Sequence, residues 1–383
     1  MTSSRISCRD RRLFFLLVLI ALSVSPSVSF GQVTRFAVIG DYGGDNVNEG
    51  AVASLAKSWN PDFVITAGDN SYGSNLIDNN IGKYYHEYIG AYTGSYPPGS
   101  ATNRFFPSLG NHDYSDGAGI TAYLNYFTLP GAGVQSTGSS GNERYYDFTI
   151  GPVQFLVINS NIQEPDSITA TGLQAQWLQA QLAASTSRWK IVYFHHAAYS
   201  SSSNHGSTVI MQWPYEDWGA DIVIGGHDHT YERILRDDDD DGVTIPYFVN
   251  GLGGRSIYGF VPSGFVAGSK VRYNANYGAQ LVEATPYLIT LKFYSIAGGP
   301  TGTLIDSYSL CDCHGTRGNL NGDVADVVDS SDLTVMVEYL FFGGRLWNCP
   351  SENNVDAQGG VDISDLSALV DYLFFGASLP VCQ

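Results

Sequence analysis

Arg35-Phe-Ala-Val-Ile-Gly-Asp-Tyr-Gly43 is the stretch of the chain that decides the fold. The apolar residues from Phe36 to Ile39 predict a strand that is buried on both faces, as in a parallel sheet. Asp41 follows where this strand opens into a glycine-bearing turn. Ligand sites of α/β sheets lie at such strand ends, because the strand fixes the position and the turn exposes the side chain. We therefore expect Asp41 to be a functional residue.

Similar donor groups recur along the chain. Predicted buried strands span 35–39, 62–66, 153–158, 190–194 and 221–224. The donor stretches are Gly40-Asp-Tyr-Gly43, Gly68-Asp-Asn-Ser-Tyr72, Gly110-Asn-His-Asp113, Phe194-His-His196 and Gly226-His-Asp-His229. A shared carboxylate, imidazoles and an amide oxygen can hold two cations that activate water and neutralise a bound phosphate. The pattern therefore predicts a binuclear metal site.

The arrangement of helices and strands changes along the chain. Helical spacing at 173–184 and 208–218 lies between the early strands, which predicts an α/β domain whose helices cover the sheets. Later β-rich runs follow without long helices between them, which favours an antiparallel second half; they span 247–250, 280–283, 287–294 and 304–310. A mixed sheet or a two-sheet sandwich is expected.

Composition excludes several classes of protein. The 383 residues carry a formal net charge of -18, with 37 acidic and 19 basic side chains, and only 15% are charged. The chain is too apolar for disorder and too acidic for a general nucleic-acid binder. It is long enough for one large domain and a small companion.

The N-terminus has the layout of a secretory signal peptide. Four arginines precede the apolar segment Leu13–Leu22 and the small-residue stretch Ser23–Ser29. We expect removal of residues 1–31, no membrane span afterwards, and a secreted, periplasmic or cell-surface protein. The alternatives are a retained membrane anchor and, from Arg11-Arg12, a twin-arginine export signal.

The order of the donor motifs resembles the calcineurin-like metallophosphoesterases, and within them the purple, tartrate-resistant acid phosphatases. The resemblance covers roughly residues 35–254. Most metallophosphoesterases have histidine where this chain has Gly43, whereas purple acid phosphatases have glycine there and supply a tyrosinate from the position of Tyr72. The resemblance implies a four-layer α/β/β/α sandwich as the fold.

The resemblance also implies a role for each donor. A ferric ion would be held by Asp41, Asp69, Tyr72 and His229, and a divalent ion (iron, zinc or manganese) by Asp69, Asn111, His195 and His227. His112 would contact the phosphate or protonate the leaving group, and His205 would face the substrate. The implied activity is acid phosphatase: hydrolysis of phosphomonoesters by a metal-bound hydroxide. The alternatives are a phosphodiesterase or nucleotidase on the same centre, or a non-catalytic surface binding protein.

Some of these residues also have an interpretation that involves no metal or substrate. Tyr72 would otherwise be an ordinary half-buried tyrosine, and His205 an exposed residue of a serine-rich loop. His195 and His196 compete for one ligand position, and strand alternation should turn them to opposite sides of the sheet. The spacing to Tyr199 that the family has favours His195, which leaves His196 as a residue that supports the ligands or as a packing residue.

Three features match no catalytic motif. His86 and His314 are expected to be structural or exposed. The run Asp237–Asp241 predicts either a calcium loop or a solvated turn between two strands.

A duplicated unit follows Leu310, since residues 328–343 return 33 positions later as 361–376. The second copy has the spacing of an EF-hand calcium loop, and the loop of the first copy is two residues longer. The predicted calcium ligands are Asn319, Asn321, Asp323, Asp329 and Asp332, and then Asn354, Asp356, Gln358, Gly360, Asp362 and Asp365.

An amphipathic helix is predicted after each loop. The apolar faces comprise Leu333, Met336, Val337, Leu340 and Phe341 in one helix and Leu366, Leu369, Val370, Leu373 and Phe374 in the other. The duplicated unit resembles a type I dockerin module, which implies a cohesin-like partner; the alternative is a calcium-stapled stability or cell-surface module. The expected domains are the signal peptide (1–31), a catalytic domain (32–310) and this module (311–383).

The cysteines that remain after signal removal all lie in this module, at 311, 313, 349 and 382. An even number in an exported protein favours two disulfides, and three pairings are open.

Overall fold

The computed structural model describes residues 33–73, 76–238, 244–311, 316–321, 327–346 and 349–380. They form two compact units, one spanning Val33–Leu310 and one beginning at Cys311. Within these ranges, every helix is too short or too polar to span a bilayer. The predicted signal peptide, Asp239–Asp241, Cys313, His314, Asp323 and Cys382 lie outside the described residues.

Two sheets form the centre of the larger unit. The first has the strand order β13-β12-β11-β1-β2-β3 and the second β10-β8-β9-β7-β6-β5-β4. The first comprises β1 (Thr34–Ile39), β2 (Phe63–Thr66), β3 (Phe105–Pro107), β11 (Gly278–Ala284), β12 (Leu288–Ser295) and β13 (Thr303–Cys311). The second comprises β4 (Tyr146–Ile150), β5 (Val153–Val157), β6 (Trp189–His196), β7 (Ile222–Gly226), β8 (Tyr231–Arg236), β9 (Ile245–Asn250) and β10 (Ser269–Tyr273).

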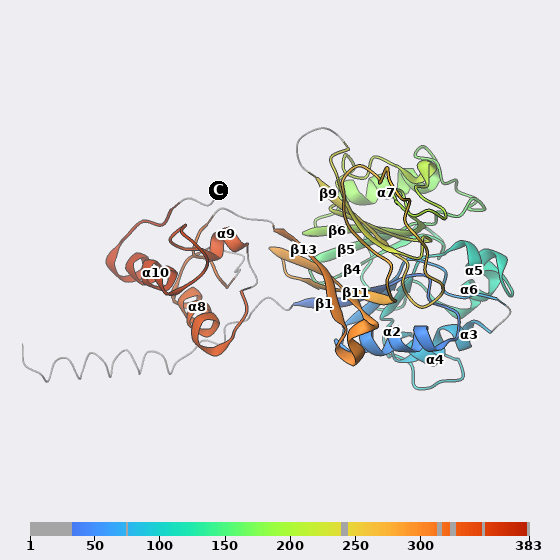
Figure 1. The fold of residues 1–383 in the computed structure, drawn as a ribbon, viewed down its shortest axis with the longest axis horizontal. Coiled ribbons are helices and arrows are strands. Elements are labelled where there is room, and N and C mark those ends of the chain that lie inside the picture. The colour runs from blue at the N-terminus through green and yellow to red at the C-terminus, as the bar shows by residue number, and fades with distance from the viewer. Residues whose placement is uncertain are drawn as a thin grey trace, which may run out of the picture. The chain divides into compact units, whose positions relative to one another are not determined.

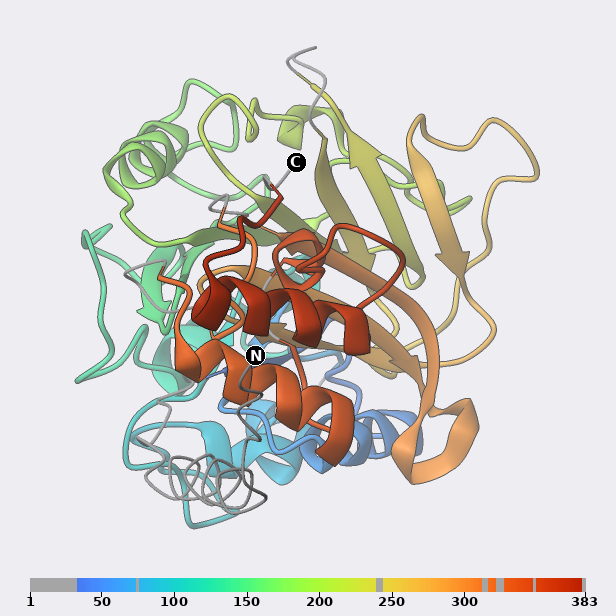
Figure 2. The same cartoon turned by 90° about the vertical axis from the view of Figure 1, so that its left-hand side faces the viewer.

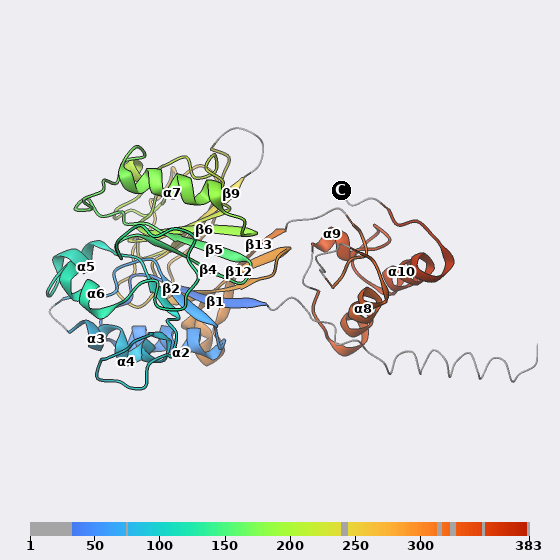
Figure 3. The ribbon, with the colours of Figure 1, turned by 180° about the vertical axis from the view of Figure 1, so that it is seen from behind.

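Helices cover the outer face of each sheet, as Figures 1 and 3 show, with α7 on one side and α2 and α4 on the other. The helices of this unit are α2 (Val47–Ser58), α3 (Ile77–Asn80), α4 (Gly82–Tyr85), α5 (Asn111–Ser115), α6 (Ile120–Tyr126) and α7 (Leu173–Ala184). This arrangement confirms the predicted four-layer α/β/β/α sandwich.

Both sheets are mixed. In the first, β1, β2 and β3 are parallel, and β11 pairs antiparallel with β1. In the second, β5, β6, β7 and β9 are parallel, and β8 is antiparallel to β9. The antiparallel strands come from the second half of the chain, with β4 as an exception, since it pairs antiparallel with β5. The carboxyl ends of the parallel strands carry the predicted donor groups.

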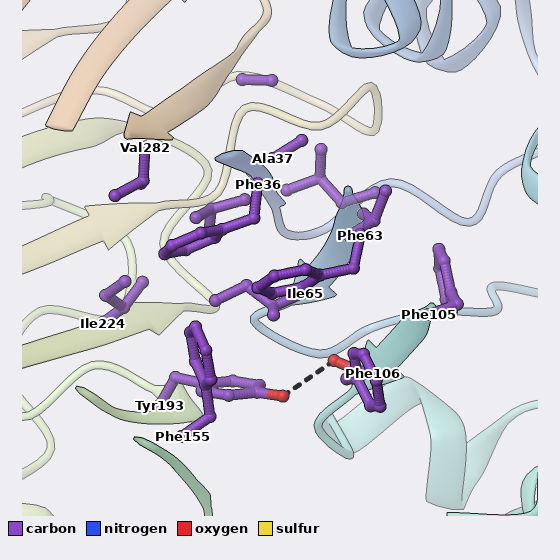
Figure 4. Close-up of a cluster of buried hydrophobic side chains, with 14 of the residues drawn as sticks. Phe36, Ala37, Phe63, Ile65, Phe105, Phe106, Phe155, Tyr193, Ile224 and Val282 are labelled. Carbon is purple, nitrogen blue, oxygen red and sulfur yellow. Dashed lines mark hydrogen bonds between the residues drawn. The ribbon is translucent and has the colours of Figure 1, made fainter. Parts of the chain in front are cut away.

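Aromatic side chains fill the space between the sheets (Figure 4). Phe36 of β1 stacks on Phe63 of β2 at 5.0 Å and meets Phe155 of β5 edge-on at 5.1 Å. Such pairs contribute about 0.5–1.5 kcal/mol each beyond the burial of their area. Tyr193 of β6 donates a hydrogen bond of 2.9 Å to the carbonyl of Phe106 in β3, which joins the two sheets through a buried polar contact.

The helix predicted at 208–218 is wrong. Only Val209–Met211 forms a single 3-10 turn. Pro214 cannot donate a helical hydrogen bond and its ring clashes with the preceding turn. The indole of Trp213 instead donates to the carbonyls of Ile168 and Ile210, so the apolar residues are buried from an irregular segment.

The smaller unit contains the repeat as two helices, α8 (Ser330–Phe342) and α10 (Ile363–Phe375), with the short α9 (Pro350–Asn353) between them. Figure 2 shows α8 and α10 side by side. Each begins at an aspartate that caps its first turn, Asp329 or Asp362, and each ends at a glycine in the left-handed conformation, Gly343 or Gly376.

The packing of these helices differs from the predicted faces. Met336 and Leu369 are buried, and the other four leucines of the predicted faces pack against this core. Phe341 and Phe374 are 59% and 63% exposed, so their assignment to the buried face is wrong. They lie in the last turn of each helix, beyond the small core.

The predicted calcium residues of the module serve as local hydrogen-bond acceptors. Asp332 accepts from the backbone of Leu320 and Asn321, and Asp365 accepts from that of Asp356. Burial raises the pKa of Asp332 to about 6. The other described residues of the set lie in the loops or first helical turns; they are Asn319, Asp329, Asn354, Gln358, Gly360 and Asp362.

The cysteines depart from the expected two disulfides. Cys349 is buried and disulfide-bonded, whereas Cys311 at the end of β13 is a free cysteine. Of the predicted acidic run, Asp238 accepts hydrogen bonds from Arg236 and Tyr247, as an ordinary ion-paired turn residue does.

Candidate metal centre

The predicted ligands come together from the ends of both sheets. Asp41 and Asp69 follow β1 and β2, and Asn111 begins α5 after β3. His195 belongs to β6, and His227 and His229 follow β7. Among the described residues, two groups can place three ligand atoms within 4.8 Å of one another: Asp41, Asp69 and His195, and His195, His196 and His227.

Three of these residues have a strained backbone. Asp41, Asp69 and His227 have positive φ angles of 54°, 53° and 69°. Such a conformation costs of order 1–3 kcal/mol for a residue other than glycine, and it persists where the surroundings enforce it. Hydrogen bonds enforce it here: the Asp41 carboxylate accepts from the backbone of His227 at 2.9 Å, and that of Asp69 accepts from His112 at 2.9 Å. Part of the backbone strain of the described residues therefore lies at the donor cluster.

The first donor set comprises Asp41, Tyr72 and His229. The Tyr72 hydroxyl lies 3.2 Å from Asp41 Oδ1 and 3.4 Å from His229 Nε2, and His229 Nε2 lies 3.3 Å from Asp41 Oδ1. Burial, followed by the Asp69 and Asp41 carboxylates, raises the pKa of Tyr72 well above its usual value. Tyr72 would thus need a strongly charged cation in order to ionise.

The second donor set comprises Asp69, Asn111, His195 and His227. His195 Nε2 lies 3.0 Å from Asn111 Oδ1, 3.2 Å from His227 Nδ1 and 3.4 Å from Asp69 Oδ2. His195 Nδ1 donates to the carbonyl of Ala67 at 2.8 Å, which in the neutral ring leaves the lone pair of Nε2 facing three other acceptor atoms.

The pKa shifts of His195 and His227 agree with this convergence of lone pairs. Burial opposes a charged His195, but the Asp69 and Asp41 carboxylates outweigh it and raise the pKa of His195 to about 9. Burial, then His195 and His196, lower the pKa of His227 well below its usual value. A buried set of two carboxylates, one amide, one phenol and three imidazoles fits a pair of metal ions, because cations stabilise the whole set.

Gly43 permits the approach of Tyr72. A Cβ atom on Gly43 would lie 1.9 Å from the backbone oxygen of Asn70, so no side chain fits there. The carbonyl of Gly43 accepts a hydrogen bond of 2.8 Å from the backbone of Tyr72. The turn after β1 is therefore pressed against the turn after β2, and this contact places the phenol next to Asp41.

His196 lies on the same side as His195, contrary to the prediction from strand alternation. The pairing of β6 with β7 shifts register between Tyr193 and His196, and this irregularity breaks the alternation. The His196 ring lies 4.9 Å from that of His195 and 4.4 Å from that of His227. Its Nδ1 contacts Ser160 Oγ at 2.8 Å. His196 therefore borders the centre rather than the core.

The two predicted catalytic histidines lie at the rim. His112 Nδ1 contacts Asp116 Oδ2 at 2.8 Å, and the His112 ring lies 4.3 Å from that of Tyr72. His205 is exposed on one side and stacks on His227 at 3.9 Å. Buried Asp228 accepts from the backbone of His205 and so holds the loop in place. Among the unassigned histidines, His86 contacts the carbonyl of Pro98, away from the centre.

Two residues of the site, Tyr258 and Ser256, were not predicted from the sequence. Tyr258 stacks flat on His229 at 4.1 Å, and Ser256 Oγ contacts His229 Nδ1 at 2.8 Å, which directs Nε2 toward Asp41. These two residues follow β9 in the stretch that begins with Gly251-Leu-Gly-Gly254. This stretch is a glycine-bearing turn after a buried strand, like the turns that carry the predicted ligands, and that pattern could have indicated both residues.

A buried clamp connects two of the ligand turns. The Asn70 amide donates to Asp113 Oδ2 at 2.8 Å, and the backbone of Gly110 donates to the same oxygen at 2.8 Å. Burial, and then the neighbouring Asp69 carboxylate, raise the pKa of Asp113 to about 7. Asp113 thereby fixes the turns that carry Asp69 and Asn111 relative to each other.

Comparison with known proteins agrees with this geometry. The family model for calcineurin-like phosphoesterases matches residues 34–231. The chain belongs to the calcineurin-like phosphoesterase family. Its relatives include purple acid phosphatase 17 of Arabidopsis thaliana, which is 24% identical over 61% of this chain and 72% of its own length. Purple acid phosphatase 15 of the same plant is 28% identical over 53% of this chain and 41% of its own length.

A solved structure has the same fold. The purple acid phosphatase PPD1 from yellow lupin seeds (Lupinus luteus) superposes with a TM-score of 0.59 and 16% identity, over 74% of this chain and 55% of its own. The chain therefore spans only part of several relatives that it matches. The family supports a metal-dependent phosphohydrolase, and the relatives named here are purple acid phosphatases.

Proposed function

We propose that this protein is an exported acid phosphatase that hydrolyses phosphomonoesters at a centre of one ferric and one divalent ion. The observation that carries the proposal is the position of Tyr72, whose hydroxyl lies 3.2 Å from Asp41 Oδ1 and 3.4 Å from His229 Nε2. A phenolate is a hard, anionic ligand that suits a ferric ion. Gly43 supports the same assignment, since the turn excludes a side chain there.

The two donor sets support a division of the ligands between the two ions. Asp41, Asp69, Tyr72 and His229 would hold the ferric ion, and Asp69, Asn111, His195 and His227 the divalent ion, which is iron, zinc or manganese. When bound, the two ions would supply positive charge for the phosphate and lower the pKa of water. Asp69 would serve both ions, because its carboxylate lies close to residues of both donor sets.

The rim histidines act on the substrate. Asp116 holds His112 through Nδ1, so Nε2 is available to contact a phosphate oxygen or to pass a proton to the leaving oxygen. The stack of His205 on His227 keeps a second imidazole at the opening of the site. Both groups are polar and solvent-accessible, as the entry of a phosphate ester requires.

The substitution Tyr72→Phe tests the proposal on the purified, metal-loaded protein. We expect the wild type to show a tyrosinate-to-iron absorption band and to hydrolyse p-nitrophenyl phosphate faster than bis(p-nitrophenyl) phosphate. The band should vanish in Tyr72→Phe and persist in Tyr215→Phe, whose buried hydroxyl contacts only the carbonyl of Met211 among the described residues. A colourless but active wild type would refute the ferric ion, and a preference for the bis-ester would refute the monoesterase.

Export is part of the same proposal and rests on the sequence of residues 1–31. Expression of the full chain with its N-terminus should yield a secreted, periplasmic or surface protein that lacks these residues. Mass spectrometry of the protein outside the cytoplasm checks this, and an intact N-terminus in the membrane fraction would contradict it.

For the module we propose two bound calcium ions and a docking role toward a cohesin-like or cell-surface partner. The duplicated loop spacing supports calcium binding. Calcium should raise the unfolding temperature of the module within the full chain, and magnesium should have a smaller effect. Equal unfolding curves with calcium and with a chelator would refute the calcium sites.

A further inference from the structure

Arg255 lies against the metal centre in a defined position. It follows β9 directly after Gly254, and its backbone donates to the carbonyl of Asp41 at 3.1 Å. The guanidinium carbon lies 4.7 Å from the centroid of the Tyr72 ring. A Cβ atom on Gly44 would lie 3.8 Å from Arg255 Cδ, so the side chain runs along this turn. Arg255 is exposed, its backbone is fixed by this hydrogen bond, and its side chain lies along the turn over Tyr72.

Arg255 has no carboxylate partner among the described residues, although the chain has nearly twice as many acidic as basic side chains. Other cationic side chains form ion pairs with carboxylates, namely those of Arg35, Lys57, Lys83, Arg144, Lys190, Arg233, Arg236 and Lys292. The guanidinium of Arg255 lies over the Tyr72 ring, and without a carboxylate partner among the described residues its N–H groups are available to an anion.

The position of Arg255 limits which anion it can bind. The Tyr72 hydroxyl lies in the donor cluster while its ring carries the guanidinium, so about one phenol ring separates Arg255 from the centre. A phosphate at the centre would contact the ligand set, and a second anionic group of the same substrate would lie near Arg255. The planar fork of arginine matches two phosphate oxygens.

We propose that Arg255 binds the second phosphate of substrates with a pyrophosphate bond and thereby determines specificity. This inference rests on the proposed phosphatase function. In the reaction, the oxygen of water bonds to the phosphorus at the centre, the bridging P–O bond breaks, and its electron pair stays on the bridging oxygen. The released phosphate takes up a proton and dissociates from Arg255. A simple aryl phosphate has no group for Arg255 to bind.

The substitution Arg255→Gln in the metal-loaded full chain tests this specificity. We expect kcat/KM for inorganic pyrophosphate to fall roughly 10- to 100-fold more than kcat/KM for p-nitrophenyl phosphate, mainly through KM, because one charge-assisted contact is lost. Arg255→Lys should restore part of it. Arg272→Gln is the matched control, since this guanidinium also lies over an aromatic ring, that of Phe265, at 3.8 Å. It should change the two substrates equally.

Two outcomes would overturn the proposal: an equal loss for both substrates, which would mean that Arg255 acts through Tyr72, and no loss for either. Binding gives a readout that does not depend on turnover. Calorimetry should find imidodiphosphate bound more tightly than inorganic phosphate by the wild type and not by Arg255→Gln. If the wild type hydrolyses neither p-nitrophenyl phosphate nor pyrophosphate, the phosphatase proposal fails. The role of Arg255 is then tested by the binding measurement alone.

Discussion

Buried carboxylates do different things in the two units of this chain. In the larger unit, Asp41 and Asp69 are 0% and 1% exposed and lie among imidazoles and a phenol on a strained backbone. In the duplicated module, Asp332 and Asp365 are both 0% exposed, yet they accept hydrogen bonds from the backbone of their own loops. Burial of a carboxylate therefore has two different causes here: lone pairs converge from separate strands in the larger unit, and the chain forms a loop around its own carboxylate in the module.

The largest expected effect comes from removing one charge from the strained cluster. Asparagine has nearly the same shape as aspartate and also tolerates a positive φ, so the Asp69→Asn variant should fold. Activity on p-nitrophenyl phosphate should fall on the order of 10³-fold, because several kcal/mol of charge stabilisation depends on the metals that Asp69 helps to hold. Steady-state kinetics with metal analysis checks this.

The control is Asp147→Asn, which changes an equally buried carboxylate that accepts from Ser136 and Thr137. This variant should lose stability but not turnover per folded, metal-loaded molecule. If Asp69→Asn retained full metal content and activity, the contrast between the two kinds of buried carboxylate would be wrong.

A smaller effect concerns Glu49 of α2, a buried carboxyl group of the catalytic unit outside the metal-ligand set. Burial raises the pKa of Glu49 from 4.5 to about 9. Folding therefore takes up a proton, and stability is lost as the pH rises from about 4.5 toward 9. Glu49→Gln mimics the neutral form and should stabilise the protein by about 3 kcal/mol at pH 7, with little change at pH 4.

Denaturant unfolding at several pH values measures this difference. Glu87→Gln is the comparison, since this carboxylate is 39% exposed and pairs with Lys57 at the surface. A stabilisation by Glu49→Gln that did not depend on pH would contradict the buried, neutral Glu49.

The smallest effect is expected in the module. Asp362→Ala removes the acceptor of the Ser364 backbone at the start of α10 and should slightly destabilise the module in the presence of a chelator. Hydrogen exchange of α10 measures this, with the exposed Asp371→Ala in the same helix as control. Hydrolysis of p-nitrophenyl phosphate should remain that of the wild type, and a parallel loss of activity would refute independence of the two units.

The sequence predicted the strands and the ligand-bearing turns, because both have a recognisable local pattern of residues. Continuous apolar runs located strands such as β1 and β5, and the turns after the strands located Asp41, Asp69 and His227. Local pattern failed where tertiary contacts decide. The shift of register before His196 cannot be recognised in the chain, and Tyr258 reaches His229 only because the turn after β9 folds back over the centre. The exposed Phe341 has the spacing of a core residue but lies beyond the end of the small core.

The contact between Gly43 and Asn70 determines whether a metal centre with a tyrosine ligand could be changed into one with a histidine ligand at position 43. A histidine at position 43 would need room that the backbone of the second turn occupies, and that same turn delivers Tyr72. The two ligand choices therefore exclude each other through the main chain rather than through competition for a metal. Substituting Gly43 by histidine alone would therefore not produce a centre with an imidazole ligand at this position. Residues 69–72 would have to be remodelled at the same time, so the phenol ligand would be lost as the imidazole ligand is gained.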